Sequence, residues 1–195
     1  MQWPVVTVLV SLSLSCALAD DECRPKPGEK HVSVKDCCKL DLSPSSMQAT
    51  AHKCFEKFPH PKPTGPPSGP PSAEMRNSHA CMAECFFAEE KLLTADKQVD
   101  KDAVLKYFSS WNPEWTPLVK SAVDECFGSY MADVDPTLEC KSGAEQLKKC
   151  LMRQLFLNCP SAAYTASAEC DGFKAKVEKC PNMPLFMGPP GGPPK

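Results

Sequence analysis

The sequence lacks the motifs that mark several common classes of enzyme and binding protein. It contains neither G-x-S-x-G nor H-E-x-x-H, and we find no nucleophile, base and partner set, so we expect no catalytic residues. Lys and Arg are scattered among Asp and Glu at a formal net charge of −2. No basic stripe for nucleic acid is therefore expected. Asn-x-Ser/Thr is also absent, so N-glycosylation is not expected.

The sequence contains only parts of two other motifs, that of a phospholipase active site and that of a zinc site. The Cys37-Cys38 pair is typical of secreted phospholipases, but Lys39-Leu40-Asp41 stands where a His-Asp pair would be needed. His52 with Cys54, and His79 with Cys81, are the residue types that bind zinc. An even cysteine count in an oxidising compartment favours disulfides over thiolate ligands. The sequence therefore predicts no metal site and no cofactor.

Only one long apolar run occurs. It covers residues 5–18 and ends in Ala17-Leu18-Ala19, directly before the acidic residues 20–22. This pattern predicts a secretory signal peptide at residues 1–19, although the usual basic segment before the run is missing and an uncleaved anchor is the alternative. No later stretch approaches the roughly 20 apolar residues of a spanning helix. We therefore expect a secreted, extracellular protein without stable membrane insertion.

Cysteine is plentiful. The chain has 13 cysteines, and one of them, Cys16, lies in the predicted signal peptide. An even dozen in a small exported chain predicts a disulfide framework of up to six bridges. These twelve residues are Cys23, Cys37, Cys38, Cys54, Cys81, Cys85, Cys126, Cys140, Cys150, Cys159, Cys170 and Cys180.

Proline and glycine are concentrated in two segments. Residues 59–72 are half proline and predict an extended connector. The tail, residues 181–195, is similar but contains four large apolar residues, Met183, Leu185, Phe186 and Met187, so we expect it to dock against the domain. A single helical domain is predicted at residues 20–180. The connector is long enough for the first helix to exchange between two chains, so a homodimer is one expected partner arrangement.

Elsewhere the apolar spacing is helical throughout, and no alternating run predicts a strand. Ser43-Pro44, Ser72, Asp100 and the Ser142/Glu145 capping box mark helix starts. Further helices are predicted at residues 115–130 and 170–180. The predicted fold class is all-α: a compact, disulfide-stapled bundle of about six helices or more.

The cysteine spacing resembles that of insect odorant-binding proteins. The features are Cys81-x3-Cys85, about forty residues to the next cysteine, and Cys150-x8-Cys159 followed by Pro160. The additional cysteines are similar to those of the Plus-C subgroup, and the likeness spans residues 23–180. It implies helices around an apolar cavity that holds small volatile or lipophilic molecules.

The resemblance also implies three disulfides, Cys54–Cys85, Cys81–Cys150 and Cys126–Cys159. Cys140 competes with Cys126 for the third. The remaining cysteines, with Cys140 among them, would pair in an unknown order: Cys23, Cys37, Cys38, Cys140, Cys170 and Cys180.

Ligand binding would depend on apolar helix faces, since small-molecule pockets are mostly apolar with few polar groups. The candidate ligand-binding residues are Phe55, Met82, Phe86, Leu105, Phe108, Trp111, Trp115, Val119, Val123, Phe127, Leu151 and Leu155. Plain core packing is the alternative role of each. Tyr130 and Gln154 are the candidate polar contacts. Among the histidines, His52 and His79 are the candidates for acid-triggered ligand release.

The expected function is a secreted, non-enzymatic carrier of small hydrophobic ligands, such as odorants or pheromone-like volatiles. An olfactory receptor is a further expected partner. The alternatives are a lipophile carrier or scavenger outside olfaction, and an extracellular interaction module whose helices pack without a cavity. Tissue of expression separates the first two, and ligand uptake separates both from the third.

Overall fold

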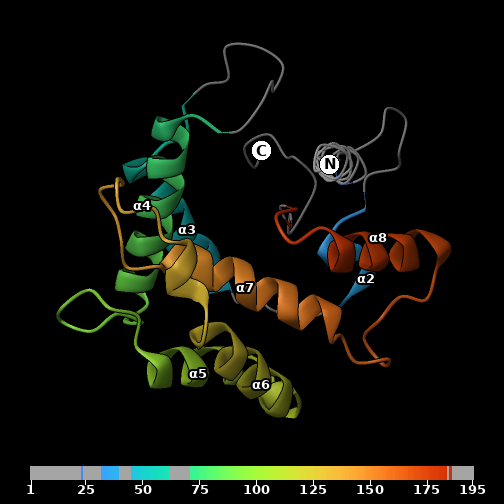
Figure 1. The fold of residues 1–195 in the computed structure, drawn as a ribbon. Coiled ribbons are helices and arrows are strands. Elements are labelled where there is room, and N and C mark those ends of the chain that lie inside the picture. Colours follow the sequence, from blue (N-terminus) through green and yellow to red (C-terminus); the bar gives the residue numbers. More distant parts are fainter. Residues whose placement is uncertain (1–22, 24–31, 40–44, 62–70, 184, 186–195) are drawn as a thin grey trace, which may run out of the picture. The chain divides into compact units, whose positions relative to one another are not determined.

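A computed structural model of the chain describes residues 23, 32–39, 45–61, 71–183 and 185. These residues are helical, as predicted, and they contain isolated bridges at Cys38–Tyr164 and Leu93–Val99 but no named strand (Figure 1). The predicted signal peptide lies outside the described residues, as do most of the proline-rich connector and the tail. No helix in the described part of the chain is long and apolar enough to cross a membrane.

The chain divides into two compact units. Residues 40–159 form the larger unit, and the segment up to residue 39 forms the smaller one with residues 160 onward. The elements of the larger unit are α3 (Ser45–Lys57), α4 (Ala73–Glu89), α5 (Lys101–Ser109), η1 (Pro113–Trp115), α6 (Thr116–Phe127), η2 (Tyr130–Asp133) and α7 (Ala144–Leu157). The smaller unit contains α2 (Val34–Cys37) and α8 (Ala168–Lys179). The helix α2 and both 3₁₀ helices were not predicted.

In the larger unit the long helices pack side by side in the order α3, α4, α7, α6 and α5. Helix α4 contacts α3 and α7, and α6 contacts α7 and α5 (Figure 1). The face of α6 that lies in the interior contains Val119 and Val123, while α7 contributes Leu147, Leu151 and Leu155 at four-residue spacing. This spacing places the buried residues of each helix on one side, as the periodicity predicts.

Two of the predicted helix caps are present. The Ser72 hydroxyl accepts a hydrogen bond from Met75 N at 3.1 Å, and Asp100 Oδ1 accepts one from Ala103 N at 3.0 Å. Each satisfies a backbone N–H that the first helical turn leaves without a partner. Helices α4 and α5 therefore begin where the sequence signals place them.

The predicted Ser142/Glu145 capping box is wrong. Helix α7 begins one residue later, and its N-cap is Gly143 in the left-handed conformation with φ of 76°. Glu145 therefore occupies the second helical position, where it cannot complete the box. The Ser142 N–H instead donates to Glu84 on α4 at 3.1 Å. A tertiary contact replaces the local one.

Three disulfides lie in the larger unit. Cys54–Cys85 joins α3 to α4, which is the pairing that the resemblance implies. The other two pairs are Cys81–Cys140 and Cys126–Cys150.

The structure thus contradicts the expected Cys81–Cys150 and Cys126–Cys159 bridges. Helices α6 and α7 contact each other, and this brings Cys126 and Cys150 to a Cα separation of 5.7 Å. That separation is ideal for a disulfide. Cys81 then meets Cys140 in the segment before α7, at 5.0 Å.

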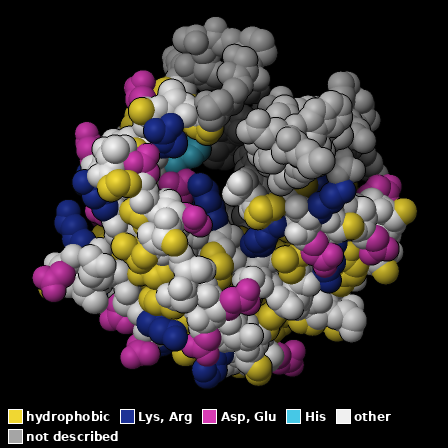
Figure 2. Space-filling model, in the orientation of Figure 1, with side chains coloured by type: hydrophobic (Ala, Val, Ile, Leu, Met, Phe, Trp, Pro, Cys, Tyr) yellow, Lys and Arg dark blue, Asp and Glu magenta, His cyan; other side chains and the backbone are white. Residues whose placement is uncertain are grey.

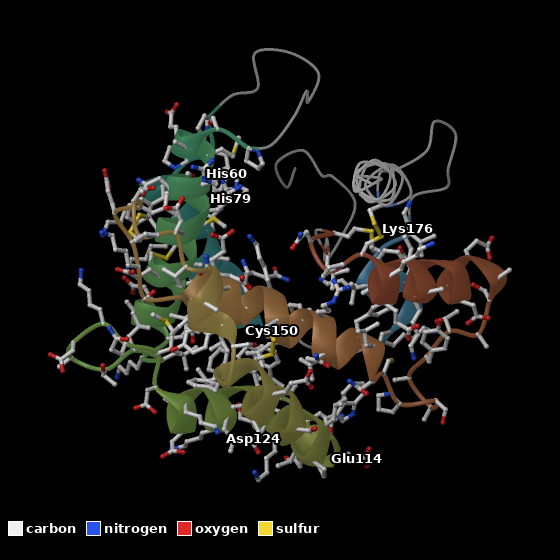
Figure 3. All side chains as sticks on the ribbon, viewed as in Figure 1. His60, His79, Glu114, Asp124, Cys150 and Lys176 are labelled. Carbon is white, nitrogen blue, oxygen red and sulfur yellow. A yellow bond between two sulfur atoms is a disulfide. The ribbon has the colours of Figure 1, made fainter. Side chains whose placement is uncertain are left out.

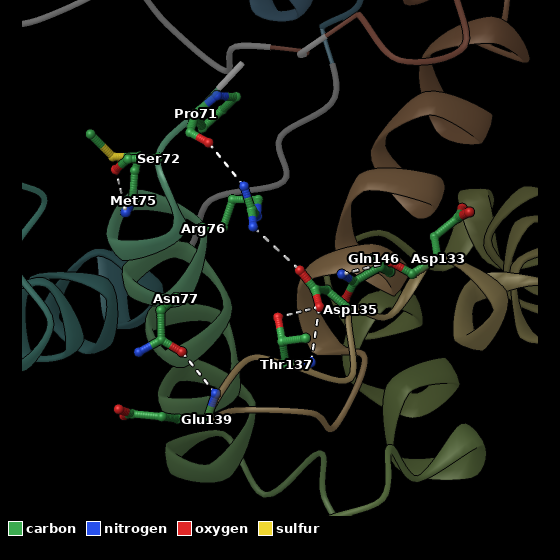
Figure 4. Close-up of polar contacts among 10 residues, drawn as sticks. All are labelled: Pro71, Ser72, Met75, Arg76, Asn77, Asp133, Asp135, Thr137, Glu139 and Gln146. Atoms are coloured by element: carbon green, nitrogen blue, oxygen red, sulfur yellow. Dashed lines mark hydrogen bonds and ion pairs between the residues drawn. The ribbon is translucent and has the colours of Figure 1, made fainter.

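Polar contacts fasten the same segment to α4 (Figure 4). Arg76 forms an ion pair with Asp135 at 3.5 Å, and the Asn77 side-chain oxygen accepts a hydrogen bond from Glu139 N at 2.9 Å. Gln146 on α7 also donates to the Asp133 carbonyl. The segment between η2 and α7 is therefore held on α4 by one covalent bond and by several polar contacts.

The smaller unit is held by two disulfides, Cys23–Cys180 and Cys37–Cys170. The second joins α2 to α8, and the Tyr164 hydroxyl donates to Asp171 on α8 at 3.0 Å. Cys38 and Cys159 are disulfide-bonded as well. The predicted framework of twelve bonded cysteines therefore exists, although two of the three expected pairings are wrong.

Candidate ligand-binding site

Three aromatic side chains gather at the end of α5. The Tyr107 ring centroid lies 5.4 Å from that of Phe108 and 5.0 Å from that of Trp111, while Phe108 and Trp111 are 4.5 Å apart. The steep interplanar angles are those that aromatic rings prefer. Phe108 is buried, whereas Tyr107 and Trp111 remain partly accessible. We refer to these three residues as the aromatic cluster.

Five of the predicted ligand-binding residues are buried in the packed interior. Phe108 is 7% exposed, and the other four are at most 2% exposed: Val119, Val123, Leu151 and Leu155. They lie on α5, α6 and α7, on the sides that face the interior. Burial at this level is what ordinary core packing produces.

Six others are only partly buried: Met82, Phe86, Leu105, Trp111, Trp115 and Phe127. They lie on or beside α4, α5 and α6. Phe127 contacts Tyr130 with ring centroids 5.2 Å apart, and the Lys101 ammonium lies 5.7 Å above the Phe127 ring. These side chains combine apolar surface with access to solvent, which is what a small hydrophobic molecule needs in order to reach them.

Phe55 differs from the other eleven candidates. It lies on α3, and its side chain is 44% exposed. Its ring packs edge-on against His60, with centroids 5.3 Å apart. The structure therefore places Phe55 with histidine rather than with the aromatic cluster.

The most distinctive polar group in this region is one that the sequence analysis missed. Tyr107 Oη is buried and has no hydrogen-bond partner of good geometry among the described residues. Burial is the main cause that raises the pKa of the Tyr107 hydroxyl, and the charge of the Glu90 carboxylate and a poorly aligned hydrogen bond to it add to the shift. The spacing of Tyr107 and Trp111, one helical turn apart, is the signal that could have identified it.

The two polar candidates from the sequence serve other contacts. Burial raises the pKa of the Tyr130 hydroxyl, and its ring lies against Gly143. Gln154 donates a hydrogen bond to Glu125 at the surface. Neither side chain belongs to the aromatic cluster.

The cysteines of the two zinc alternatives, Cys54 and Cys81, are both in disulfides. At the surface, His52 Nδ1 lies 3.6 Å from Glu56 Oε1. His79 instead packs against His60, with ring centroids 4.5 Å apart (Figure 3). No group of three metal-binding side chains occurs among the residues that the structure describes.

Comparison with known proteins gives distant relatives of one kind. No protein-family model matches the chain. General odorant-binding protein 68 of Anopheles gambiae is 25% identical over 174 residues, which cover 82% of this chain and 76% of the relative. Odorant-binding protein 47 of the same species is 24% identical over 195 residues, covering 90% and 81%. General odorant-binding protein 67 is 26% identical over 184 residues, covering 90% and 87%.

These similarities extend over most of each chain, so they concern the whole fold rather than one motif. They support a relationship between this all-α, disulfide-stapled chain and the insect odorant-binding proteins.

Proposed function

We propose that the protein is a secreted carrier that binds small hydrophobic ligands without covalent chemistry. The observation that supports this most is the similarity to odorant-binding proteins over 82–90% of the chain. Burial of an apolar ligand gains about 25 cal/mol per Å² of surface removed from water. Such binding needs neither a catalytic group nor a cofactor. On the same basis we propose that odorants or similar volatiles are the ligands. From the additional cysteines we propose that the protein belongs with the Plus-C subgroup.

The aromatic cluster is the proposed contact surface for the ligand. Trp111 combines a large apolar ring with partial access to solvent, and the neighbouring Tyr107 hydroxyl has no protein partner of good geometry among the described residues. A ligand hydroxyl or carbonyl could satisfy that group, because buried polar atoms are usually hydrogen-bonded. Leu105, partly buried on the same helix, would extend the apolar contact.

Fluorescent-probe titration of the oxidised protein tests the proposal. We expect saturable binding of N-phenyl-1-naphthylamine and its displacement by volatile alcohols and aldehydes. Replacement of Trp111 by Ala should weaken probe binding, whereas Met131→Ala, at an exposed apolar residue outside the candidate set, serves as the control. A folded protein with no saturable uptake would refute the carrier function.

One observation favours a second function, an extracellular interaction module. Val123, Leu151 and Leu155 are at most 1% exposed, as expected of a tightly packed core. A folded protein that takes up no probe but binds another protein would support this second function.

Exchange of α3 within a homodimer and contact with an olfactory receptor are further proposals. A strict monomer in analytical ultracentrifugation at high concentration would exclude the dimer. Binding to cells that express candidate receptors, with and without ligand, would test the receptor contact.

A further inference from the structure

A compact group of titratable side chains lies where α4 faces α7. His60 and His79 are in edge-to-face contact, and His60 Nδ1 lies 3.1 Å from the Ser78 hydroxyl (Figure 3). His79 Nδ1 lies 3.9 Å from Glu145 Oε1 on α7. In the space-filling view, histidine surface lies beside Lys and Arg side chains (Figure 2).

Glu145 is the acidic residue of this group, and it already has cationic partners. It is 7% exposed and forms ion pairs with Lys149, one turn further along α7, and with His79 when that ring is protonated. The negative charge of Glu145 is thereby matched, mainly by Lys149. One carboxylate carries a single negative charge, so Lys148 and Lys149 together leave an excess of positive charge beside Glu145.

That second lysine is Lys148. It forms no hydrogen bond or ion pair with the described residues, although His60, His79 and Glu145 are all close enough to interact with it electrostatically. Part of its side chain reaches solvent, yet burial of the ammonium dominates and lowers its pKa, while Glu145 opposes the shift. An ammonium group that forms no ion pair can take an anionic ligand, because charge-assisted hydrogen bonds to a carboxylate are stronger than neutral ones.

Apolar surface lies directly beside the group. Phe55, 44% exposed, packs edge-on against His60 at 5.3 Å. Such a large exposed apolar ring beside cationic and hydrogen-bonding side chains matches a ligand with an anionic head and an apolar chain. Fatty acids have this chemistry, and their carboxylate suits both an ammonium and imidazole N–H donors.

We propose that, within the carrier function proposed above, Lys148, His60 and His79 form a binding site for the carboxylate of a fatty acid whose chain contacts Phe55. Lys148 supplies the charge, and the two imidazoles supply hydrogen-bond donors. The site selects ligands with an acidic head over neutral ligands of equal chain length.

The test compares decanoic acid with 1-decanol at pH 7 by isothermal titration calorimetry, which measures each affinity directly, because the fluorescent probe is expected to bind at the aromatic cluster instead. We expect the oxidised wild-type protein to bind the acid about tenfold more tightly than the alcohol, from one charge-assisted hydrogen bond. Lys148→Met should reduce this ratio to about one by weakening acid binding. Lys148→Arg should retain the preference, and Lys141→Met, at an exposed lysine elsewhere in the larger unit, is the matched control.

A second measurement does not depend on any variant. Decanoic acid labelled with ¹³C at the carboxyl should show a lower pKa when bound than when free, because a nearby ammonium stabilises the carboxylate. An unchanged or raised carboxyl pKa would overturn the site. Alcohol uptake with no preference for the acid would overturn the site but leave the carrier function standing. A folded protein that binds neither compound would overturn both.

Discussion

Gly143 packs directly against the ring of Tyr130. A Cβ atom added at Gly143 would lie 2.6 Å from Tyr130 Cε2 and 3.0 Å from Met131 Sδ. The residue also has φ of 76°, which side chains other than hydrogen rarely adopt. Two features therefore require glycine here: the left-handed backbone conformation and the close contact with the ring of Tyr130 in η2.

Replacement of Gly143 by Ala should destabilise the larger unit by about 1–3 kcal/mol, because left-handed strain and overpacking act together. Chemical denaturation of the oxidised protein measures the change. Gly172→Ala on α8 is the control, since an added Cβ there meets nothing within 4 Å. We expect the control to be neutral or to stabilise by about 0.5–1 kcal/mol. Equal effects at both positions would contradict the packing observed at Tyr130.

The cysteine pairing gives a second prediction. Proteolysis without reduction, followed by mass spectrometry, should yield peptides that join Cys81 to Cys140 and Cys126 to Cys150. Peptides that join Cys81 to Cys150 would refute the pairing in the structure and restore the one that the resemblance implies.

The two bridges should also differ in their contribution to stability. In the chain-entropy view a longer closed loop constrains the unfolded chain more. The sequence separations are 59 for Cys81–Cys140 and 24 for Cys126–Cys150, which correspond to about 4 and about 3 kcal/mol. Paired Cys→Ser substitutions at each bridge, compared by denaturation, measure the difference.

Helical periodicity and local caps made the helices of the larger unit predictable. Ser72 and Asp100 cap α4 and α5 through their own side chains, so the information is contained within four residues of sequence. Gly143 shows where this fails. The start of α7 depends on Glu84 binding the Ser142 N–H and on the ring of Tyr130, and neither contact is visible locally.

The candidate site was predictable only in part, for a related reason. Apolar spacing identified the interior faces that contain Val123 and Leu151, but it could not distinguish a packed interior from a binding surface. It also grouped Phe55 with them, although α3 places that ring in the open beside His60. The Tyr107 hydroxyl and Lys148 are distinctive through what surrounds them, which only the tertiary structure reveals.

Removal of the Tyr107 hydroxyl gives a third prediction. Tyr107 Oη is buried and lacks a well-aligned partner among the described residues. Tyr107→Phe should therefore leave the free energy of unfolding of the ligand-free protein unchanged or raise it by up to about 1 kcal/mol. The same change should weaken binding of volatile alcohols more than that of hydrocarbons of equal size. Phe108→Ala, which opens the buried core, should instead cost about 3–5 kcal/mol. Loss of stability in Tyr107→Phe would reveal that the hydroxyl has a partner.

The histidine pair predicts how stability depends on pH. Burial is the main cause that lowers the pKa of both His60 and His79 below 6.5; Lys148 adds to the shift of each, and the opposing effect of Glu145 on His79 is smaller. In the unfolded chain histidine has a pKa of about 6.5. The unfolded chain therefore binds more protons than the folded protein in mildly acidic solution. The free energy of unfolding should fall as the pH drops from about 7.5 through 6.5 towards the lowered folded pKa values.

Denaturation at a series of pH values measures this slope. Replacing His60 and His79 together with Phe should flatten it, because neither state would then take up those protons. If a saturating fatty acid occupies the site, its carboxylate should raise both histidine pKa values and flatten the slope in the wild type as well, whereas decanol should not. An acid-induced loss of stability that is the same with and without the two histidines would show that other groups cause it.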